Sequence, residues 1–216
     1  MLTLPLLRKM LNRAGTELKA NSKYLCELDS VAGDGDHGIT IGRMADVMKE
    51  KTEDTTIDTM RVLLDELGDA FMGINGGSAG PLWGTVFTGM AEGIDDQAEL
   101  TDLELRKMFT QAKEDFMDIS KAKPGDKTMV DALYPAIDAI IETQGSLKEI
   151  MTAAAAAADA GAEQTSTMVA RFGRAKNMGE RSIGTKDPGA VSIAILFNGM
   201  AVSYTHLRAH ETRRHL

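Results

Sequence analysis

Three aspartates, Asp29, Asp34 and Asp36, fall within eight residues of one short polar stretch. Glycines at positions 33, 35 and 38 let the backbone turn tightly enough to aim the three carboxylates at one point. Hard cations such as Mg²⁺ take oxygen ligands and offset the repulsion between such carboxylates, and protein-bound Mg²⁺ commonly holds phosphates. Aspartate and glycine are also the commonest turn residues, so an acidic, solvated turn is the alternative interpretation.

Two other motifs fit this stretch poorly. The spacing of Gly33, Gly35 and Gly38 matches the dinucleotide fingerprint, but residues 27–30 before it do not form a buried strand. The two aspartates between the glycines would also repel a bare pyrophosphate. An EF-hand loop that began at Asp34 would need glutamate at its twelfth position, where Ala45 stands. A carboxylate cluster able to present Mg²⁺ therefore remains as the functional hypothesis.

The composition suits one globular domain. The chain has 216 residues with 43% hydrophobic residues, which is enough for a full core. Its net charge of −8 argues against nucleic acid or an anionic membrane surface as a partner.

No apolar run reaches the roughly 18 residues of a membrane span, and the N-terminus lacks the basic start of a signal peptide. The single Cys26 excludes internal disulfides. We therefore expect a cytoplasmic protein.

The last fifteen residues differ in character from the rest. Residues 202–216 carry three of the four histidines and three arginines in an otherwise acidic chain. Such a change is typical of read-through from a vector or a sequencing adapter. We therefore expect residues 1–201 to form the domain and residues 202–216 to be an artefactual or disordered tail.

Apolar residues recur at helical spacing through most of the chain, which predicts an all-α fold. The segment 190–200 alternates and could also be a strand, but partner strands are missing elsewhere in the pattern. The first predicted helix covers residues 6–28 with a break near Asn21-Ser22, and the second has one apolar face made by Ile39, Ile41, Met44, Val47 and Met48. Residues 57–72 form the next, capped by Thr55 or Thr56, and a Thr101–Glu104 capping box opens a helix that runs through Ile119. Three more follow: residues 127–141 capped by Asp126, a helix that contains residues 153–158, and a helix that begins after Asp187-Pro188.

Four glycine-rich polar turns share one placement. They cover residues 33–38, 73–81, 123–128 and 173–189, and each precedes a helix or lies between two. Backbone N–H groups and the positive end of the helix dipole are available there for anions. Ordinary helix–helix connections are the alternative. If the four turns converge on one rim of a bundle, they can hold a phosphate-rich ligand without a P-loop.

These turns carry a family resemblance. The sequences are GDGDHG at 33–38, GGSAGPL at 76–82, PGDKTMVD at 124–131, and GRA, GERSIG and DPGA within 173–190. In this order, and over residues 6–201, the chain resembles the nucleotide-binding L subunit of dihydroxyacetone kinases. The resemblance implies a barrel of about eight antiparallel helices with the nucleotide at one end. The family usually has alanine before serine after the Gly-Gly pair, whereas this chain has Ser78-Ala79.

The resemblance also assigns roles to residues. It implies that Asp29, Asp34 and Asp36 hold two Mg²⁺ ions on the phosphates of ADP or ATP. We expect these aspartates and Arg174 to be the catalytic residues, with Arg174 or Arg181 supplying further positive potential. The positions that match the family's nucleotide contacts are His37, Gly38, Thr40, Ser78, Ala79, Met129, Arg174, Asp187 and Gly189.

The implied function is phosphoryl transfer. The phosphate would pass to dihydroxyacetone, or to another short ketose such as erythrulose, held on a separate K subunit. The ADP would be rephosphorylated in place by an M subunit of the phosphotransferase system, or ATP would exchange freely. A homodimer is a further expectation. A metal-dependent hydrolase and a regulatory, nucleotide-sensing subunit that binds a transcription factor are the alternative functions.

Overall fold

The structure is a computed structural model that describes residues 1–211. Nearly all of its regular structure is helical. The helices are α1 (Leu4–Ala20), α2 (Ser22–Ser30), α3 (His37–Glu53), α4 (Met60–Met72), α5 (Ala79–Glu92), α6 (Asp102–Ile119), α7 (Val130–Glu142), α8 (Leu147–Gln164) and α9 (Pro188–Glu211), with 3₁₀ segments η1 (Thr165–Thr167) and η2 (Arg174–Ser182). Two short strands, β1 (Leu2–Thr3) and β2 (Glu99–Leu100), pair antiparallel.

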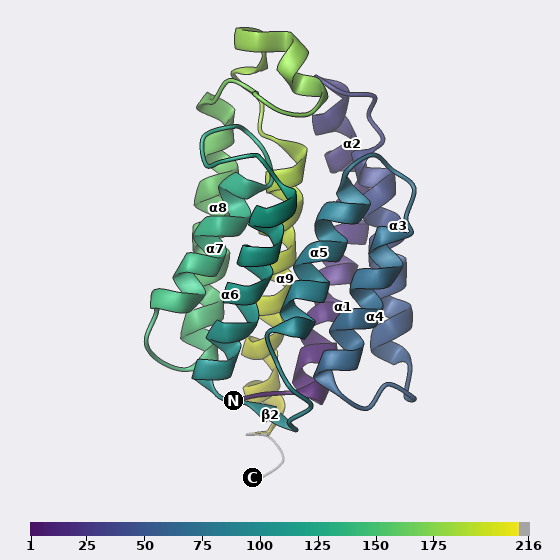
Figure 1. The fold of residues 1–216 in the computed structure, drawn as a ribbon, viewed down its shortest axis with the longest axis vertical. Helices are drawn as coiled ribbons and strands as arrows, with labels where there is room; N and C mark the ends of the chain where they lie inside the picture. Colours follow the sequence, from purple (N-terminus) through teal and green to yellow (C-terminus); the bar gives the residue numbers. More distant parts are fainter. Residues whose placement is uncertain (212–216) are drawn as a thin grey trace.

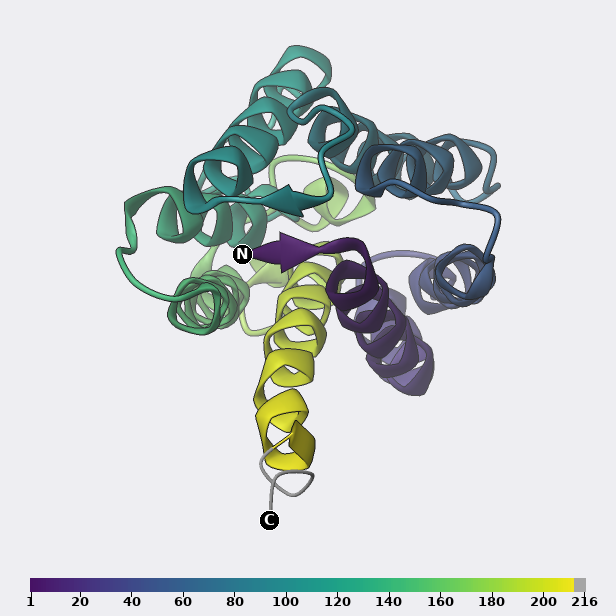
Figure 2. The ribbon, with the colours of Figure 1, turned by 90° about the horizontal axis from the view of Figure 1, so that it is seen from below.

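The helices close into a barrel. Packing contacts run in the order α1, α3, α4, α5, α6, α7, α8 and α9, and α9 then packs against α1. Viewed along the barrel, the helices surround a common axis (Figure 2). Helix α2 continues from α1 and packs against α3, while β1 and β2 lie at the opposite end from η2 (Figure 1). The predicted all-α barrel of antiparallel helices is therefore confirmed.

Several predicted helix boundaries are confirmed. The chain breaks at Asn21 between α1 and α2. Thr101 and Glu104 form a reciprocal capping box at the start of α6. Pro188 opens α9, and the Asp187 carboxylate accepts a hydrogen bond from the Ala190 backbone N–H at 2.7 Å. The segment 190–200 is helical because α9 buries its apolar residues against α1, α7 and α8.

Two predicted helix caps are wrong. Thr59, and not Thr55 or Thr56, caps α4, because the Asp54 carboxylate holds Thr56 in a turn of its own through the Thr56 backbone N–H and hydroxyl. Asp126 does not cap α7, which begins at Val130. Its carboxylate instead accepts a hydrogen bond from the Lys123 backbone N–H at 2.8 Å, within the preceding loop.

Two apolar residues assigned to buried helix faces are exposed. Ile39 is 52% exposed because it stands two residues before the buried Ile41, and a spacing of two places side chains on different sides of a helix. Ile119 ends α6 and is 51% exposed. The core itself consists of apolar residues from all the helices of the ring, with Phe71 stacked edge-on against Phe87 at 5.0 Å between ring centroids.

The predicted domain boundary at residue 202 falls inside α9, which continues to Glu211. Residues 212–216 of the predicted tail lie outside the described residues, so the tail stays a prediction. Within the described part of the chain, no helix is both long and apolar enough to cross a bilayer.

Candidate nucleotide and metal site

All four glycine-rich turns reach one cavity of about 530 Å³. Its lining includes Arg174 of η2, and η2 lies at the end of the barrel opposite β1 and β2 (Figure 1). The predicted convergence of the four turns on one rim is therefore confirmed. The turns contribute Gly33, Asp34, Asp36 and His37 from the first, Gly76, Gly77, Ser78 and Ala79 from the second, Lys127, Thr128 and Met129 from the third, and Gly173, Arg174, Ala175, Asp187 and Gly189 from the fourth. Leu28, Leu82, Trp83, Phe116 and Val130 add apolar walls.

The three aspartates form a carboxylate cluster at this cavity. Asp29 lies in the last turn of α2, and Asp34 and Asp36 lie in the connection to α3. One carboxylate oxygen from each lies within 4.8 Å of the other two. The connection depends on glycine, because Gly35 has a φ of 75°, and a Cβ on Gly33 would lie 2.3 Å from Asp29 Oδ1.

Backbone hydrogen bonds orient the cluster. Asp29 Oδ2 accepts from the backbone N–H of Asp36 at 3.0 Å and from that of His37 at 3.2 Å. These bonds join the end of α2 to the start of α3. Three convergent hard oxygen donors held by such a rigid turn fit a divalent cation such as Mg²⁺.

Arg174 comes to this cluster from a distant part of the sequence. Its guanidinium forms an ion pair with the Asp34 carboxylate, and both side chains remain about half exposed. Arg174 is the first residue of η2 and follows Gly173, whose φ is 64°. The predicted catalytic set, Asp29, Asp34, Asp36 and Arg174, is thus assembled in one place.

His37 stands at the first position of α3. Its Nε2 lies 3.2 Å from the Ser192 hydroxyl on α9, and that hydroxyl donates to the Gly189 carbonyl at 2.8 Å. Burial lowers the pKa of His37 below its ordinary value of 6.5, so the imidazole is neutral at neutral pH. A neutral imidazole adds a polar contact to the cavity without adding charge.

Gly38 and Thr40 lie one layer behind the cavity wall. A Cβ on Gly38 would lie 1.8 Å from the Ser22 carbonyl oxygen, so glycine there permits the contact between α2 and α3. Thr40 is buried in α3, and its hydroxyl would lie 2.1 Å from a Cβ on Gly76. Of the residues predicted to contact nucleotide, these two support the first and second turns and do not line the cavity.

Asp187 is a cavity carboxylate with a strongly raised pKa. Burial raises the pKa of Asp187 to about 7; the nearby Asp131 acts in the same direction, and the hydrogen bond from the Ala190 backbone opposes the rise. A Cβ on Gly189 would lie 3.0 Å from Asp187 Oδ2 and 3.3 Å from Met129 Cβ, so the third and fourth turns meet closely here.

Sequence reasoning missed Lys127 and the apolar walls. Lys127 is only 3% exposed, and its Nζ contacts four backbone carbonyls from residues 165–185. Its φ of 60° is the one positive value among non-glycine residues of the described chain. No local pattern marks this role, because the carbonyl partners of Lys127 lie 38 or more residues away in the sequence.

The chain is thus a helical barrel with a carboxylate cluster and four glycine-rich turns around one cavity. A model of the DAK2 domain matches residues 31–202, so the chain belongs to the DAK2 domain family. The ADP-binding subunit DhaL of the PEP-dependent dihydroxyacetone kinase of Escherichia coli is 35% identical over 196 residues, which cover 89% of this chain and 93% of that protein.

Two larger relatives contain a similar region. The L-erythrulose kinase of Pectobacterium atrosepticum is 35% identical over 213 residues, covering 94% of this chain and 36% of that kinase. The structure of the dihydroxyacetone kinase of C. freundii in complex with AMP-PNP and Mg²⁺ matches with a TM-score of 0.70 and 27% identity, over 92% of this chain and 34% of that one. The chain therefore spans about a third of the length of each of these two kinases.

Proposed function

We propose that this chain binds ADP or ATP with Mg²⁺ and serves as the phosphoryl-transfer subunit of a kinase for dihydroxyacetone or a related short ketose. The observation that carries the proposal is the convergence of three carboxylates, Arg174 and helix N-termini on one cavity. The ADP-binding relative from E. coli and the C. freundii complex with AMP-PNP and Mg²⁺ support it.

The chain's own residues divide the work of holding a nucleotide. Asp29, Asp34 and Asp36 would hold Mg²⁺, which when bound would supply positive charge to neutralise the phosphates. Arg174 supplies a guanidinium beside the cluster, where it can compensate developing negative charge. Ser78 and Ala79 at the start of α5 line the same cavity, and backbone N–H groups at such a helix start suit phosphate oxygens. The apolar walls exclude water from one side of the cavity.

The ketose would be held by a separate K subunit. The E. coli relative is one subunit of a kinase, and both dihydroxyacetone and erythrulose kinases are among the relatives. We further propose that an M subunit of the phosphotransferase system rephosphorylates the bound ADP in place. Retention of ADP by the purified protein through extensive dialysis would support this route, and rapid loss would favour free exchange of ATP.

The proposal is tested by calorimetric titration with ADP, with and without Mg²⁺. We expect Mg²⁺ to tighten ADP binding to the wild-type protein. In Asp36→Ala, we expect the Mg²⁺-dependent increase in ADP affinity to be smaller by about tenfold or more, because one carboxylate that would coordinate the metal is removed. Asp46→Ala is the matched control, because Asp46 lies on α3 and pairs with Lys19 at 2.6 Å, away from the cavity. Equal effects of Mg²⁺ on the wild type and on Asp36→Ala would contradict the proposal.

A further inference from the structure

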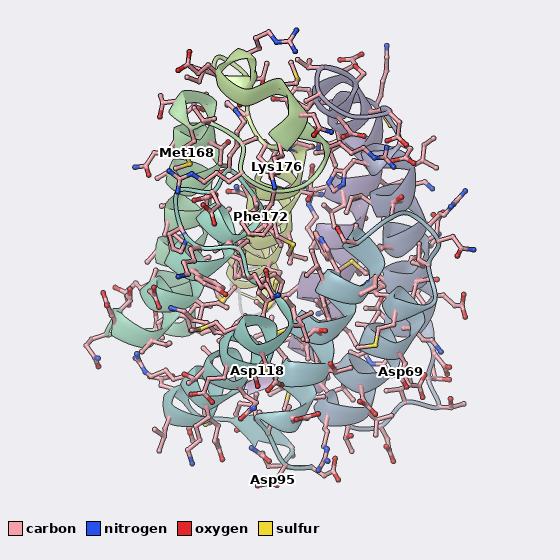
Figure 3. The ribbon with its side chains drawn as sticks, turned by 45° about the horizontal axis from the view of Figure 1, so that its top comes forward. Asp69, Asp95, Asp118, Met168, Phe172 and Lys176 are labelled. Atoms are coloured by element: carbon pink, nitrogen blue, oxygen red, sulfur yellow. The ribbon has the colours of Figure 1, made fainter. Side chains whose placement is uncertain are left out.

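A single segment crosses the mouth of the cavity. Residues 165–187, here called the cap segment, connect α8 to α9 and include η1 and η2 (Figure 1). Met168, Phe172 and Lys176 mark its course over the end of the barrel (Figure 3). The cap segment delivers Arg174 to the aspartate cluster and ends at Asp187.

The cap segment has little apolar anchorage of its own. Within it, only Thr165, Ala170 and Ser182 are buried. Three polar bonds tie its two flanks together: Gly184 N–H to the Ser166 carbonyl at 2.7 Å, Ala170 N–H to the Ser182 hydroxyl at 2.9 Å, and Asp187 N–H to the Thr165 hydroxyl at 2.9 Å. The position of Arg174 therefore depends on polar links at the base of this segment.

The Lys127 ammonium sits at that base. Its Nζ lies 2.9 Å from the Thr165 carbonyl oxygen and 3.4 Å from that of Met168 on the first flank. On the second flank it lies 2.6 Å from the carbonyl oxygens of both Ser182 and Thr185. An ammonium has three donors and no acceptor, so carbonyls from both flanks can satisfy all three donors, with the fourth carbonyl, that of Met168, at the longest distance.

The place of Lys127 disfavours both the charge of its ammonium and the conformation of its backbone. Burial lowers the pKa of Lys127, since it disfavours the charged form, while the Asp187 carboxylate raises it. The φ of 60° is unfavourable for a residue with a Cβ. The surrounding turn is fixed independently, because the Asp131 carboxylate accepts from the backbone N–H groups of Gly125 at 2.5 Å and Thr128 at 2.8 Å.

We propose that Lys127 is a positioning residue for the nucleotide site: its ammonium joins the two flanks of the cap segment and thereby holds Arg174 against the aspartate cluster. This inference deepens the function proposed above and rests on it. A residue without donors would leave four carbonyls without their partner and free the two flanks to separate. Lys127 also lines the cavity, but its ammonium is directed at these carbonyls and so acts on the ligand through the cap segment.

The first test is hydrogen exchange on the ligand-free protein. Lys127→Met keeps the length of the side chain and removes its donors, so we expect faster exchange at the amides of Ala170, Gly184 and Asp187 than in the wild type. Lys123→Met is the control, because Lys123 is exposed in the same loop and loses the same charge. Unchanged exchange at these amides in Lys127→Met would overturn the proposal.

The second test is a double-mutant cycle on ADP affinity with Mg²⁺, measured well below the melting temperature of every variant. If Lys127 acts through Arg174, Lys127→Met and Arg174→Gln each weaken binding by about tenfold, and the pair weakens it little further. Lys123→Met should add nothing to Arg174→Gln. Additive losses for Lys127→Met and Arg174→Gln would overturn the proposal, because a purely structural role predicts independence.

Two further outcomes are separable. If Lys127→Met does not fold, Lys127→Gln, which keeps two N–H donors, must give exchange rates in the cap segment above those of the wild type; wild-type rates would overturn the proposal. If the wild type binds no ADP, the proposed function fails, and the exchange experiment alone then decides whether Lys127 holds the cap segment.

Discussion

At the scale of single residues, the site combines charges that would repel one another without a partner. Asp34 faces the other two aspartates and is also paired with Arg174. Asp187 is a second centre of negative charge on the same cavity, and burial together with Asp131 keeps its pKa near 7. A carboxylate so placed couples folding stability to pH.

The sign of that coupling follows from the shift. Because the folded state raises the pKa of Asp187 from its ordinary value of 3.8 to about 7, the folded state binds the proton more tightly than the unfolded state. The contribution of Asp187 to the free energy of unfolding is therefore greatest in acid and falls as pH rises through the interval between these two values. Above about pH 8 the contribution is constant.

Asp187→Asn should remove this dependence. Asparagine also caps helices well, so the start of α9 is preserved. Without nucleotide or Mg²⁺, we expect the melting temperature of the variant to rise relative to the wild type as pH goes from about 5 to about 8. A difference that stays constant over this range would show that Asp187 titrates normally.

Residue types and spacing predicted the chemistry of the aspartates, because Asp29, Asp34 and Asp36 lie within eight residues and need only a tight backbone to meet. They did not predict the contacts of Lys127 with the cap segment. Its function depends on carbonyl groups, which every residue possesses, and on the return of residues 165–185 to the same point. Because the groups that accept from Lys127 are backbone carbonyls, the types and spacing of side chains do not reveal them.

At the scale of elements, the junction between α2 and α3 positions the cluster. The two helices approach so closely at Gly38 that a Cβ would lie 1.8 Å from the Ser22 carbonyl oxygen and 2.8 Å from Cys26 Sγ. Asp29 lies one turn beyond Cys26 on α2, so separating the helices would move it relative to Asp36.

Gly38→Ala should therefore damage both stability and the site. We expect the free energy of unfolding to fall by about 1–3 kcal/mol, because the added methyl group meets backbone atoms, and the Mg²⁺-dependent gain in ADP affinity to fall with it. Denaturant unfolding and calorimetry measure the two effects.

Gly42→Ala is the matched control one turn further along α3. Its nearest contact would be the Ser22 hydroxyl at 3.4 Å, an ordinary distance. Alanine there should leave ADP binding unchanged and raise helix stability by about 0.5–1 kcal/mol. Equal losses in the two variants would mean that the close approach at Gly38 has no special part in the site.

Helix existence was predictable, whereas several helix starts were not. The Thr101–Glu104 pair is confirmed because both members of the capping box lie in the local sequence. Asp126 failed as a cap because the loop competes for its carboxylate through the Lys123 N–H, and the backbone of Asp126 accepts from Arg171 N–H in the cap segment. Local sequence propensity does not include a hydrogen bond to a residue as distant as Arg171.

At the scale of the whole molecule, closure of the ring creates the cavity. The first turn precedes α3 and the fourth precedes α9, and α9 reaches the first turn through the contact between Ser192 and His37. The repeated placement of glycine-rich turns before helices indicated a shared rim. The ring order of the helices, which brings Arg174 to Asp34 across 140 positions, required the three-dimensional structure.

The proposed function requires that the aspartate cluster binds Mg²⁺ and that a nucleotide docks in the cavity at this end of the barrel. The most direct measurement is a crystal structure of the protein grown with ADP and Mg²⁺. The account predicts metal density within coordination distance of Asp29, Asp34 and Asp36, with the ADP phosphates beside it and the adenosine within the cavity. Density for ADP elsewhere on the molecule, with no metal at the three aspartates, would contradict the account.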